Sequence, residues 1–413
     1  MHQTRTATQL KQLHLQYGDA FYLFDKQVLK QNISGFKLAF EHFYQHVQLA
    51  YSVKTNYIPA VCKVARDEGL LAEVVSGMEY ELVKKAGFQG SEIIFNGPLK
   101  AEDELVRAFS DGALVQFDSR AEFRVLKQYL DQHPGENVRC AIRCNFDIGE
   151  APRSRFGFDA ENGEAEAVCE ELFAIEGCKL IGLHCHFSTR NRSAESFRIR
   201  TKKLIRLAKK VFNGRRLEYL NIGGGFFGPL PESLSSQYEF EIPSFSDYGE
   251  AVGNQMKHHF PQQAPLLILE PGISLLADTM KFVCKVASIK TIGATPVVTL
   301  TGSLHNVRPN LSNIEIPLSV VKMTGHKNSV ENGMIGGYTC VKKDILCDSF
   351  TGEIQEGDSV LFDNVGAYNI VFKPPFMRGA PPILMTDGSN PDDGVEVIRE
   401  KETLDNMFAT YKF

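Results

Sequence analysis

The stretch VQLAYSVKTNYIPAVCKVARDEGLLAEVV, residues 47–75, contains the structural unit from which the first two thirds of this chain is built. Two apolar runs of strand length, 47–53 and 70–75, flank a segment with the apolar spacing of a helix. Strand, helix and strand in this order predict a βαβ unit, whose two strands run parallel. The first run leads directly into Lys54, so a charged side chain stands where a buried strand is expected to end.

The same alternation continues to about residue 270. Six further apolar runs of strand length follow, at 91–95, 113–117, 138–144, 178–185, 217–222 and 265–270. Most are separated by segments with helical periodicity, as in AESFRIRTKKLIRLAKKVF. An open doubly wound sheet is one architecture compatible with this order. Eight regular units in a row favour closure instead, so the α/β pattern predicts a (β/α)8 barrel of the TIM type.

The character of the sequence changes after about residue 275. Strand-like runs at 281–292, 296–303, 358–372 and 381–389 are joined by Gly, Pro, Asn and Asp turns. We therefore expect a C-terminal, mostly β domain over residues 276–413, after a barrel domain over residues 30–275. Residues 1–29 form an N-terminal segment, whose strand-like run at 20–29 is expected to join the β domain.

Composition narrows the functional class. The 413 residues carry a net charge of −5 without a basic run, which argues against a dedicated nucleic-acid binder. No apolar stretch approaches the roughly 20 residues of a membrane helix, and the N-terminus has no apolar signal core. The nine cysteines form no zinc-type CxxC pairs. We expect a soluble cytoplasmic protein with reduced thiols and no metal site.

Unusual residues gather at the predicted ends of the barrel strands, where barrel enzymes place their active sites. In chain order they are Lys54, Asn96-Gly97-Pro98, Arg143, Asn145, His184, His186, Gly223-Gly224-Gly225 and Glu270-Pro271-Gly272. A lysine at such a mouth can lose its proton on desolvation and form a Schiff base. Taken alone, Lys54 is equally compatible with a rim lysine in a salt bridge.

The ends of the other predicted strands carry residues suited to bind an aromatic ring that bears a phosphate group. Glycines 223–225 offer closely spaced backbone N–H groups for a phosphate. Glu270 is a buried carboxylate that needs a cationic partner, such as a protonated pyridine nitrogen. His186 offers a flat face for stacking. His184 and His186 point the same way and raise the alternative of a metal, but no third ligand has a matching spacing. Together these residues predict a pocket for pyridoxal 5′-phosphate.

These motifs resemble those of the fold-type III pyridoxal-phosphate-dependent decarboxylases, the group of diaminopimelate, ornithine and biosynthetic arginine decarboxylases. The resemblance runs from FYLFD to FKPPF and includes YSVKTN, GLHCHFST, IGGGF, EPG, SRFGF and GAYNI. It implies that Lys54 binds the cofactor covalently and that His186 stacks on its ring. It also implies a set of further cofactor contacts: Arg143 at the phenolic oxygen, Glu270 at the ring nitrogen, and Thr189, Gly223, Gly224, Gly225 and Tyr368 at the phosphate.

The resemblance extends to a cysteine followed four residues later by an aspartate, which in the family reaches across a homodimer interface. GGYTCVKKDIL has this spacing, so Cys340 is the expected proton donor and Asp344 an expected substrate contact. Cys347 is an alternative whose flanking residues fit less well. The implied assembly is a homodimer with shared active sites.

Two departures from the family pattern concern the substrate. Ile273 stands where the family usually has the arginine of EPGR, and Arg155 and Arg308 are possible substitutes. Val341, followed by two lysines, stands where relatives acting on diamino acids carry an acid. This favours a substrate whose distal end is not a free cation, such as a citrate-conjugated diamino acid of siderophore biosynthesis. If the two lysines are only solvated turn residues, a free diamino acid (diaminopimelate, ornithine, lysine or arginine) remains the alternative.

The sequence thus predicts a decarboxylase that removes the α-carboxylate of an amino acid. A racemase on the same barrel is a rival hypothesis, and it would need a base on each face of the cofactor. A catalytically inactive regulator is another, and it would be expected to lack Lys54 or Cys340, both of which are present.

Overall fold

The structure is a computed structural model that describes residues 5–149, 153–261, 264–310, 313–372, 376–388 and 394–412. The chain divides into two compact units. The first comprises Lys30–Pro229 and Phe240–Leu275, and the second comprises Met1–Leu29, Leu230–Glu239 and Leu276–Phe413. The segment Leu230–Glu239 therefore belongs to the second unit, although barrel residues precede and follow it in the sequence.

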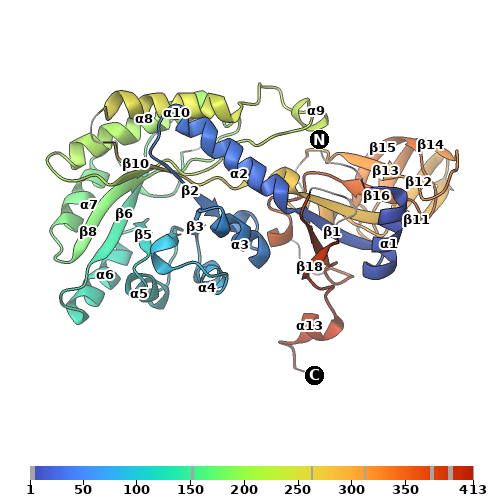
Figure 1. The fold of residues 1–413 in the computed structure, drawn as a ribbon, viewed down its shortest axis with the longest axis horizontal. Coiled ribbons are helices and arrows are strands. Elements are labelled where there is room, and N and C mark those ends of the chain that lie inside the picture. Colours follow the sequence, from blue (N-terminus) through green and yellow to red (C-terminus); the bar gives the residue numbers. More distant parts are fainter. Residues whose placement is uncertain are drawn as a thin grey trace. The chain divides into compact units, whose positions relative to one another are not determined.

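The first unit is a closed barrel of eight parallel strands, which confirms the predicted fold (Figure 1). Its strands are β2 (Val47–Ser52), β3 (Leu71–Val74), β4 (Ile93–Phe95), β5 (Leu114–Phe117), β6 (Val138–Asn145), β8 (Cys178–His184), β9 (Tyr219–Asn221) and β10 (Leu266–Leu269). Neighbouring strands pair in chain order, and the pairing of β10 with β2 closes the ring. Side chains from successive strands, such as Ala50, Ile94 and Ile181, pack together in the layered interior.

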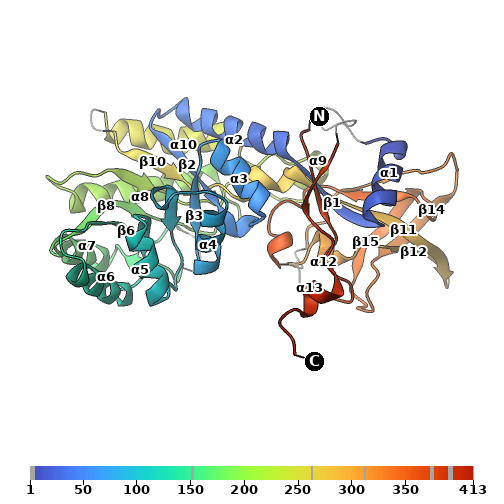
Figure 2. The ribbon, with the colours of Figure 1, turned by 60° about the horizontal axis from the view of Figure 1, so that its bottom comes forward.

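Helices follow the strands around the outside of the barrel, as α4 to α7 do in Figure 2. They are α2 (Lys26–Glu41), α3 (Pro59–Asp67), α4 (Gly77–Lys85), α5 (Glu102–Ser110), α6 (Ala121–Gln132), α7 (Glu164–Phe173), α8 (Ala194–Val211) and α10 (Phe245–His259). Helix α3 has proline at its start, where the missing N–H costs nothing. Its buried residues Val61, Cys62, Val64 and Ala65 form one stripe, which is the spacing read in the sequence.

The second unit is built on a mostly antiparallel β-sheet with short helices, as the sequence predicts. Its strands are β1 (Ala20–Asp25), β11 (Met280–Ile292), β12 (Thr295–Leu300), β13 (Leu318–Val321), β14 (Ser329–Gly336), β15 (Ile345–Glu353), β16 (Ser359–Phe362), β17 (Ile383–Thr386) and β18 (Glu396–Arg399). Strand β1 lies between β11 and β17, so the N-terminal segment supplies a central strand of this sheet. Helix α1 (Ala7–Tyr17) packs Leu10 and Leu13 into the core beneath it.

Among the described residues, no helix is both long and apolar enough to cross a membrane.

Candidate active site

Lys54 lies at the mouth of the barrel in a short 3-10 turn, Val53–Thr55, directly after β2. Its Nζ is 2.5 Å from Oε2 of Glu73 and donates to Oγ of Ser52 at 2.8 Å. Ser52 and Glu73 are brought together because they are register partners in the parallel pair β2–β3. The carboxylate of Glu73 is only 1% exposed, so the lysine has a buried counter-ion. This arrangement fixes the position of the amine at the end of the strand.

Glu270 lies after β10 and is also buried. Its Oε1 accepts hydrogen bonds from Nδ2 of Asn96 at 2.8 Å and from Nδ2 of Asn221 at 2.7 Å. Nε2 of His184 is 3.5 Å from its other oxygen. Burial alone would raise the pKa of Glu270, but its interactions with His184 and Lys54 hold the pKa below the ordinary range. A carboxylate kept ionised in this way is suited to hold a proton on a pyridine nitrogen.

The side chain of Asn96 connects the two buried carboxylates. Its Nδ2 donates to Oε1 of Glu73 at 3.0 Å as well as to Glu270. Its Oδ1 is buried and has no hydrogen-bond partner among the described residues. A continuous chain of polar contacts therefore runs from Lys54 to Glu270 through Glu73 and Asn96.

His186 follows β8 and is held as a neutral imidazole. Its Nδ1 accepts a hydrogen bond from the backbone N–H of Gly224 at 3.0 Å, so the ring carries its proton on Nε2. Burial, together with the positive charges of Arg143 and Lys54, lowers the pKa of His186 well below its ordinary value. Nη2 of Arg143 in turn donates to the carbonyl oxygen of His186 at 3.0 Å. The ring is thereby fixed in orientation, as stacking on a flat cofactor requires.

The glycine segment after β9 has no room for side chains. A Cβ on Gly224 would lie 2.2 Å from the carbonyl oxygen of Glu270. A Cβ on Gly223 would lie 2.7 Å from the carbonyl oxygen of Cys185, and this residue has a φ of +71°. The backbone of residues 223–225 thus passes close to both Glu270 and His186. Lysine, ionised carboxylate, neutral imidazole and glycine loop together form a donor set that fits pyridoxal phosphate.

Three further predicted residues line one cavity beside His186: Arg143, Arg155 and Thr189. Arg143 is largely buried, and its Nη1 is 3.9 Å from Oδ1 of Asp118. Thr189 is 8% exposed, and its hydroxyl accepts a hydrogen bond from the N–H of Arg192 at 3.1 Å. The barrel unit therefore brings together the predicted site residues that it carries.

The remaining predicted residues belong to the second unit. Cys340 is exposed in the loop between β14 and β15. Asp344, by contrast, is 5% exposed, and its carboxylate accepts hydrogen bonds from the loop and from the start of helix α12 (Leu304–Val307). The donors are the hydroxyl of Ser303, the N–H of Leu304, and both the N–H and the hydroxyl of Thr339. Both oxygens of Asp344 thus help to hold the loop that carries Cys340, and the predicted contact of Asp344 with the substrate stays a prediction.

Tyr368 and Arg308 also have defined local environments in the second unit. Tyr368 has a φ of +53°, which is unusual for a residue other than glycine, and its ring stacks on Phe372 at 5.8 Å. Nη1 of Arg308 donates to the carbonyl oxygen of Ile314 at 2.5 Å. The predicted contact of Tyr368 with the phosphate and that of Arg308 with the substrate stay predictions.

Glu73, whose Oε2 is 2.5 Å from Nζ of Lys54, is not among the residues predicted from the sequence. The signal was present, because Glu73 is the only charged residue in the apolar run LLAEVV. A charge within a buried strand requires a partner. Asn221 gave no comparable signal, because an asparagine near a strand end is common in turns. Among the described residues, no group of three or more His, Cys, Asp or Glu side chains is placed to hold a metal ion.

Comparisons with known proteins identify the family of this chain. Residues 29–277 match the family described as "Pyridoxal-dependent decarboxylase, pyridoxal binding domain". The diaminopimelate decarboxylase of Aquifex aeolicus is 26% identical over 412 residues, covering 96% of this chain and 92% of that protein. The L-glutamyl-[BtrI acyl-carrier protein] decarboxylase of Niallia circulans is 28% identical over 416 residues, covering 94% and 93%. A crystal structure of diaminopimelate decarboxylase from M. jannaschii superposes with a TM-score of 0.86 at 25% identity, covering 97% of this chain and 94% of that one.

The barrel fold and the match to this family define a pyridoxal-phosphate enzyme. The chain belongs to the pyridoxal-dependent decarboxylase family. It is a decarboxylase, and pyridoxal phosphate is its cofactor.

Proposed function

We propose that this protein removes the α-carboxylate of an amino acid, with Lys54 as the residue that binds the cofactor. The observation that carries this proposal is the chain of contacts from Lys54 through Glu73 and Asn96 to the ionised Glu270. When bound, pyridoxal phosphate supplies an electron sink for the electrons left at Cα as CO2 departs.

The proposal gives each of the following site residues a task. Glu270 holds a proton on the ring nitrogen, because its own pKa is low and it stays ionised. His186, a neutral imidazole, would stack on the ring. Glu73 and Ser52 hold Nζ of Lys54 in place and balance its charge. Cys340 returns a proton to Cα, as its exposure in a loop held by Asp344 allows.

For the substrate, the relatives favour a free diamino acid. The Aquifex relative is a diaminopimelate decarboxylase, and a diaminopimelate decarboxylase from M. jannaschii has been crystallised with L-lysine. We therefore place diaminopimelate first among the candidate substrates.

A second candidate is an amino acid whose distal end is not a free cation. Three residues, Val341 to Lys343, separate Cys340 from Asp344, and none of them is acidic. The Niallia relative acts on a glutamyl group joined to a carrier protein. A citrate-conjugated diamino acid of siderophore biosynthesis belongs to this class and is the substrate that Val341 favours.

We further infer a cytoplasmic homodimer in which Cys340 of one subunit serves the active site of the other. The exposure of Cys340 at a loop between β14 and β15 is compatible with such a contact.

The test is CO2 release from a panel of diaminopimelate, lysine, ornithine, arginine and citrate-conjugated diaminopropionate. Lys54→Ala should abolish turnover and also covalent attachment of the cofactor, measured by borohydride reduction and mass spectrometry. Lys63→Ala, an exposed lysine on α3, is the matched control and should behave like the wild type. Normal CO2 release by Lys54→Ala would exclude this assignment, and racemisation without CO2 release would favour the rival racemase.

A further inference from the structure

A cavity of about 1070 Å³ lies in the barrel unit, at the end where the strands begin. Its lining includes the first or second residue of five strands: Leu71 of β3, Leu114 of β5, Arg139 of β6, Tyr219 of β9 and Leu266 of β10. The candidate active site, in contrast, is formed by residues that follow the other ends of the strands. Parallel strands begin at one end of a barrel and finish at the other, so this cavity is separate from the candidate active site.

The floor of the cavity is apolar. Four of its side chains belong to the buried cluster inside the barrel, and they are Ile94, Leu114, Tyr219 and Ile268. Leu71 and Leu266 pack against this cluster and are only partly buried, so the cavity reaches the interior of the barrel. An apolar ligand that displaced water from this surface would gain free energy.

The wall of the cavity reverses the charge balance of the chain. Among the described lining residues there are four cations, Arg139, Lys209, Arg215 and Arg216, and one acid, Glu218. The whole chain, in contrast, has 45 Lys and Arg against 50 Asp and Glu. A local excess of positive charge in a concave surface favours an anionic ligand.

Two of the four cations are balanced by carboxylates. Arg215 donates to both carboxylate oxygens of Glu170, at 3.0 Å each. Nη2 of Arg139 is 3.2 Å from Oε2 of Glu218, the single acid of the lining. The charges of these two arginines are therefore used within the fold.

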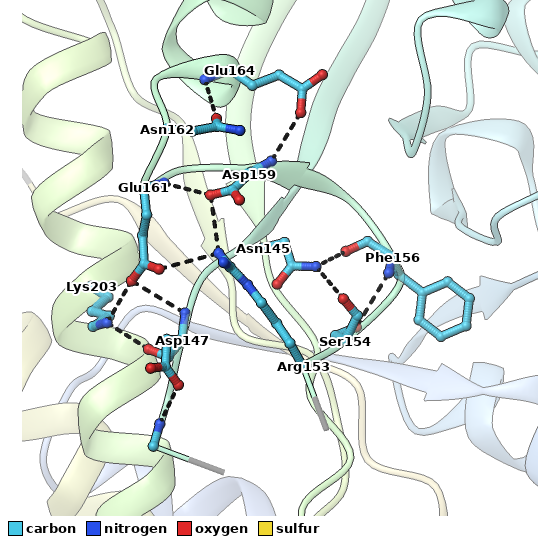
Figure 3. A network of polar contacts seen from close by, with 11 residues as sticks. Asn145, Asp147, Arg153, Ser154, Phe156, Asp159, Glu161, Asn162, Glu164 and Lys203 are labelled. Carbon is cyan, nitrogen blue, oxygen red and sulfur yellow. Dashed lines mark hydrogen bonds and ion pairs between the residues drawn. The ribbon is translucent and has the colours of Figure 1, made fainter. Parts of the chain in front are cut away.

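The loop after β6, at the opposite end of the barrel, shows the same pairing of cations (Figure 3). Nη2 of Arg153 donates to Asp159 at 3.0 Å and to Glu161 at 3.2 Å. Nζ of Lys203 in α8 is 2.9 Å from Oε1 of Glu161. Cations paired in this way hold the loop, and their charge is already balanced.

Arg216 and Lys209 differ from these paired cations. Arg216 is exposed and has no ion-pair partner in the part of the chain that the structure describes. Nζ of Lys209 is 3.5 Å from Nδ1 of His259, and burial together with Lys209 lowers the pKa of this histidine. The imidazole therefore stays neutral and leaves the charge of Lys209 unbalanced. Two unbalanced cations thus lie beside an apolar floor.

We propose that this cavity binds an organic anion, with an apolar body on the floor and a carboxylate or phosphate head at Arg216 and Lys209. Guanidinium and ammonium groups both bind such oxyanions through charge-assisted hydrogen bonds. The cavity matches the upper end of the range of about 300 to 1,000 Å³ for ligand pockets, so it has room for a body of several carbon atoms. The proposal goes beyond the decarboxylase activity and does not depend on it.

Calorimetric titration of the holoenzyme with octanoate, 1-octanol and acetate tests the two parts of the ligand. Octanoate should bind at least about tenfold more tightly than 1-octanol, because only octanoate has a charged head. Acetate should bind at least about 100-fold more weakly than octanoate, since each buried CH2 group contributes about fourfold. Octyl phosphate carries the other head on the same body, and the tighter of the two anions identifies the head group. Equal binding of octanoate and 1-octanol would overturn the proposal.

Substitutions in the lining test where octanoate binds. Arg216→Ala should lower its affinity by at least about tenfold, because a charge-assisted hydrogen bond is lost. Ser91→Trp, at an exposed position of the lining, should also lower the affinity, since it fills part of the cavity without changing its charge. Arg124→Ala removes an exposed arginine of α6 outside this lining and is the matched control. Wild-type affinity in both Arg216→Ala and Ser91→Trp would overturn the proposal.

Two further measurements separate this cavity from the candidate active site. Lys54→Ala should bind octanoate as the wild type does, and saturating the apoenzyme with pyridoxal phosphate should leave the affinity for octanoate unchanged. Loss of octanoate binding in either measurement would assign the anion to the active site and overturn the proposal. Octanoate binding at Arg216 without CO2 release from any amino acid would count against the proposed activity alone.

Discussion

At the scale of single residues, the environment of Lys54 is decided by neighbours that are distant in sequence. Glu73 comes from the next strand and Glu270 from the last one, and both are buried. The sequence identified Lys54, His186 and Glu270 because charged residues at the ends of apolar strands are conspicuous. It did not identify Glu73 as the partner of Lys54, because that pairing depends on the register of β2 and β3.

Glu79 provides a residue-scale prediction about pH. This side chain is 5% exposed in α4 and accepts the N–H of Val75 at 2.8 Å. Burial raises its pKa from 4.5 to about 6, with Glu73 adding to the effect. The folded state therefore binds the proton more tightly than the unfolded state. This contribution to stability is complete below pH 4.5 and is lost as the pH rises through 6, which corresponds to about 2 kcal/mol.

The substitution Glu79→Gln should remove this dependence. The amide can still accept the backbone hydrogen bond, so the variant should be more stable than the wild type at pH 7.5 by about 2 kcal/mol and should lose the difference at pH 4.5. Denaturant unfolding at the two pH values measures the effect. Glu81→Gln, at an exposed position of the same helix, is the control. Identical pH dependence in Glu79→Gln and the wild type would refute the assignment.

At the scale of elements, the barrel strands were predictable and some boundaries were not. The apolar runs located all eight strands, because each buried strand must be apolar on both faces. The predicted strand at 20–29 ends at Asp25, where α2 begins. Oδ1 of Asp25 accepts the N–H groups of Gln27 and Val28, so it caps the helix. An aspartate inside an apolar run was the available signal for this change of structure.

The glycine segment after β9 gives an element-scale prediction. Gly224→Ala places a methyl group against the backbone oxygen of Glu270, which cannot move without disturbing β10. We expect at least about a tenfold loss of affinity for pyridoxal phosphate, because misplacing the loop weakens its contacts with an anion. Fluorescence titration of the apoenzyme with the cofactor measures this.

Gly35→Ala is the matched control for that substitution. Gly35 lies in α2, and its Cβ would have no atom within 4 Å. Replacing glycine by alanine within a helix should stabilise the protein by up to about 1 kcal/mol and leave cofactor affinity unchanged. Wild-type affinity in Gly224→Ala would show that the segment tolerates a side chain and does not form the cradle.

At the scale of the whole molecule, the proposed function gives Cys340 of the second unit a role in catalysis. The loop between β14 and β15 presents Cys340 at the surface, and Asp344 fixes this loop from within. A proton donor at such a surface position would need a second surface to exclude water during the reaction. A partner subunit would supply that surface, which supports the proposed homodimer.

Mixing inactive variants tests this assembly. Lys54→Ala and Cys340→Ala, co-expressed or dissociated and reassociated, should recover partial activity, because a mixed dimer retains one complete site. The mixture of Lys54→Ala with Lys54→Met should stay inactive, since no combination restores the lysine. Absence of recovery in exchanged dimers would indicate that each site uses the cysteine of its own chain.

The sequence by itself determined the barrel, the strand-rich second region and the residues at the strand ends, because burial imposes apolar periodicity and makes polar exceptions visible. Only the tertiary structure decided which of these residues meet. The register of β2 and β3 pairs Lys54 with Glu73, and closure of the barrel brings Asn96 to Glu270. The tertiary structure also buries Asp344, which holds the loop that carries Cys340. It brings two separate loops together around the cavity beside His186. These contacts join residues far apart in the chain, so their distances follow from packing and not from local spacing.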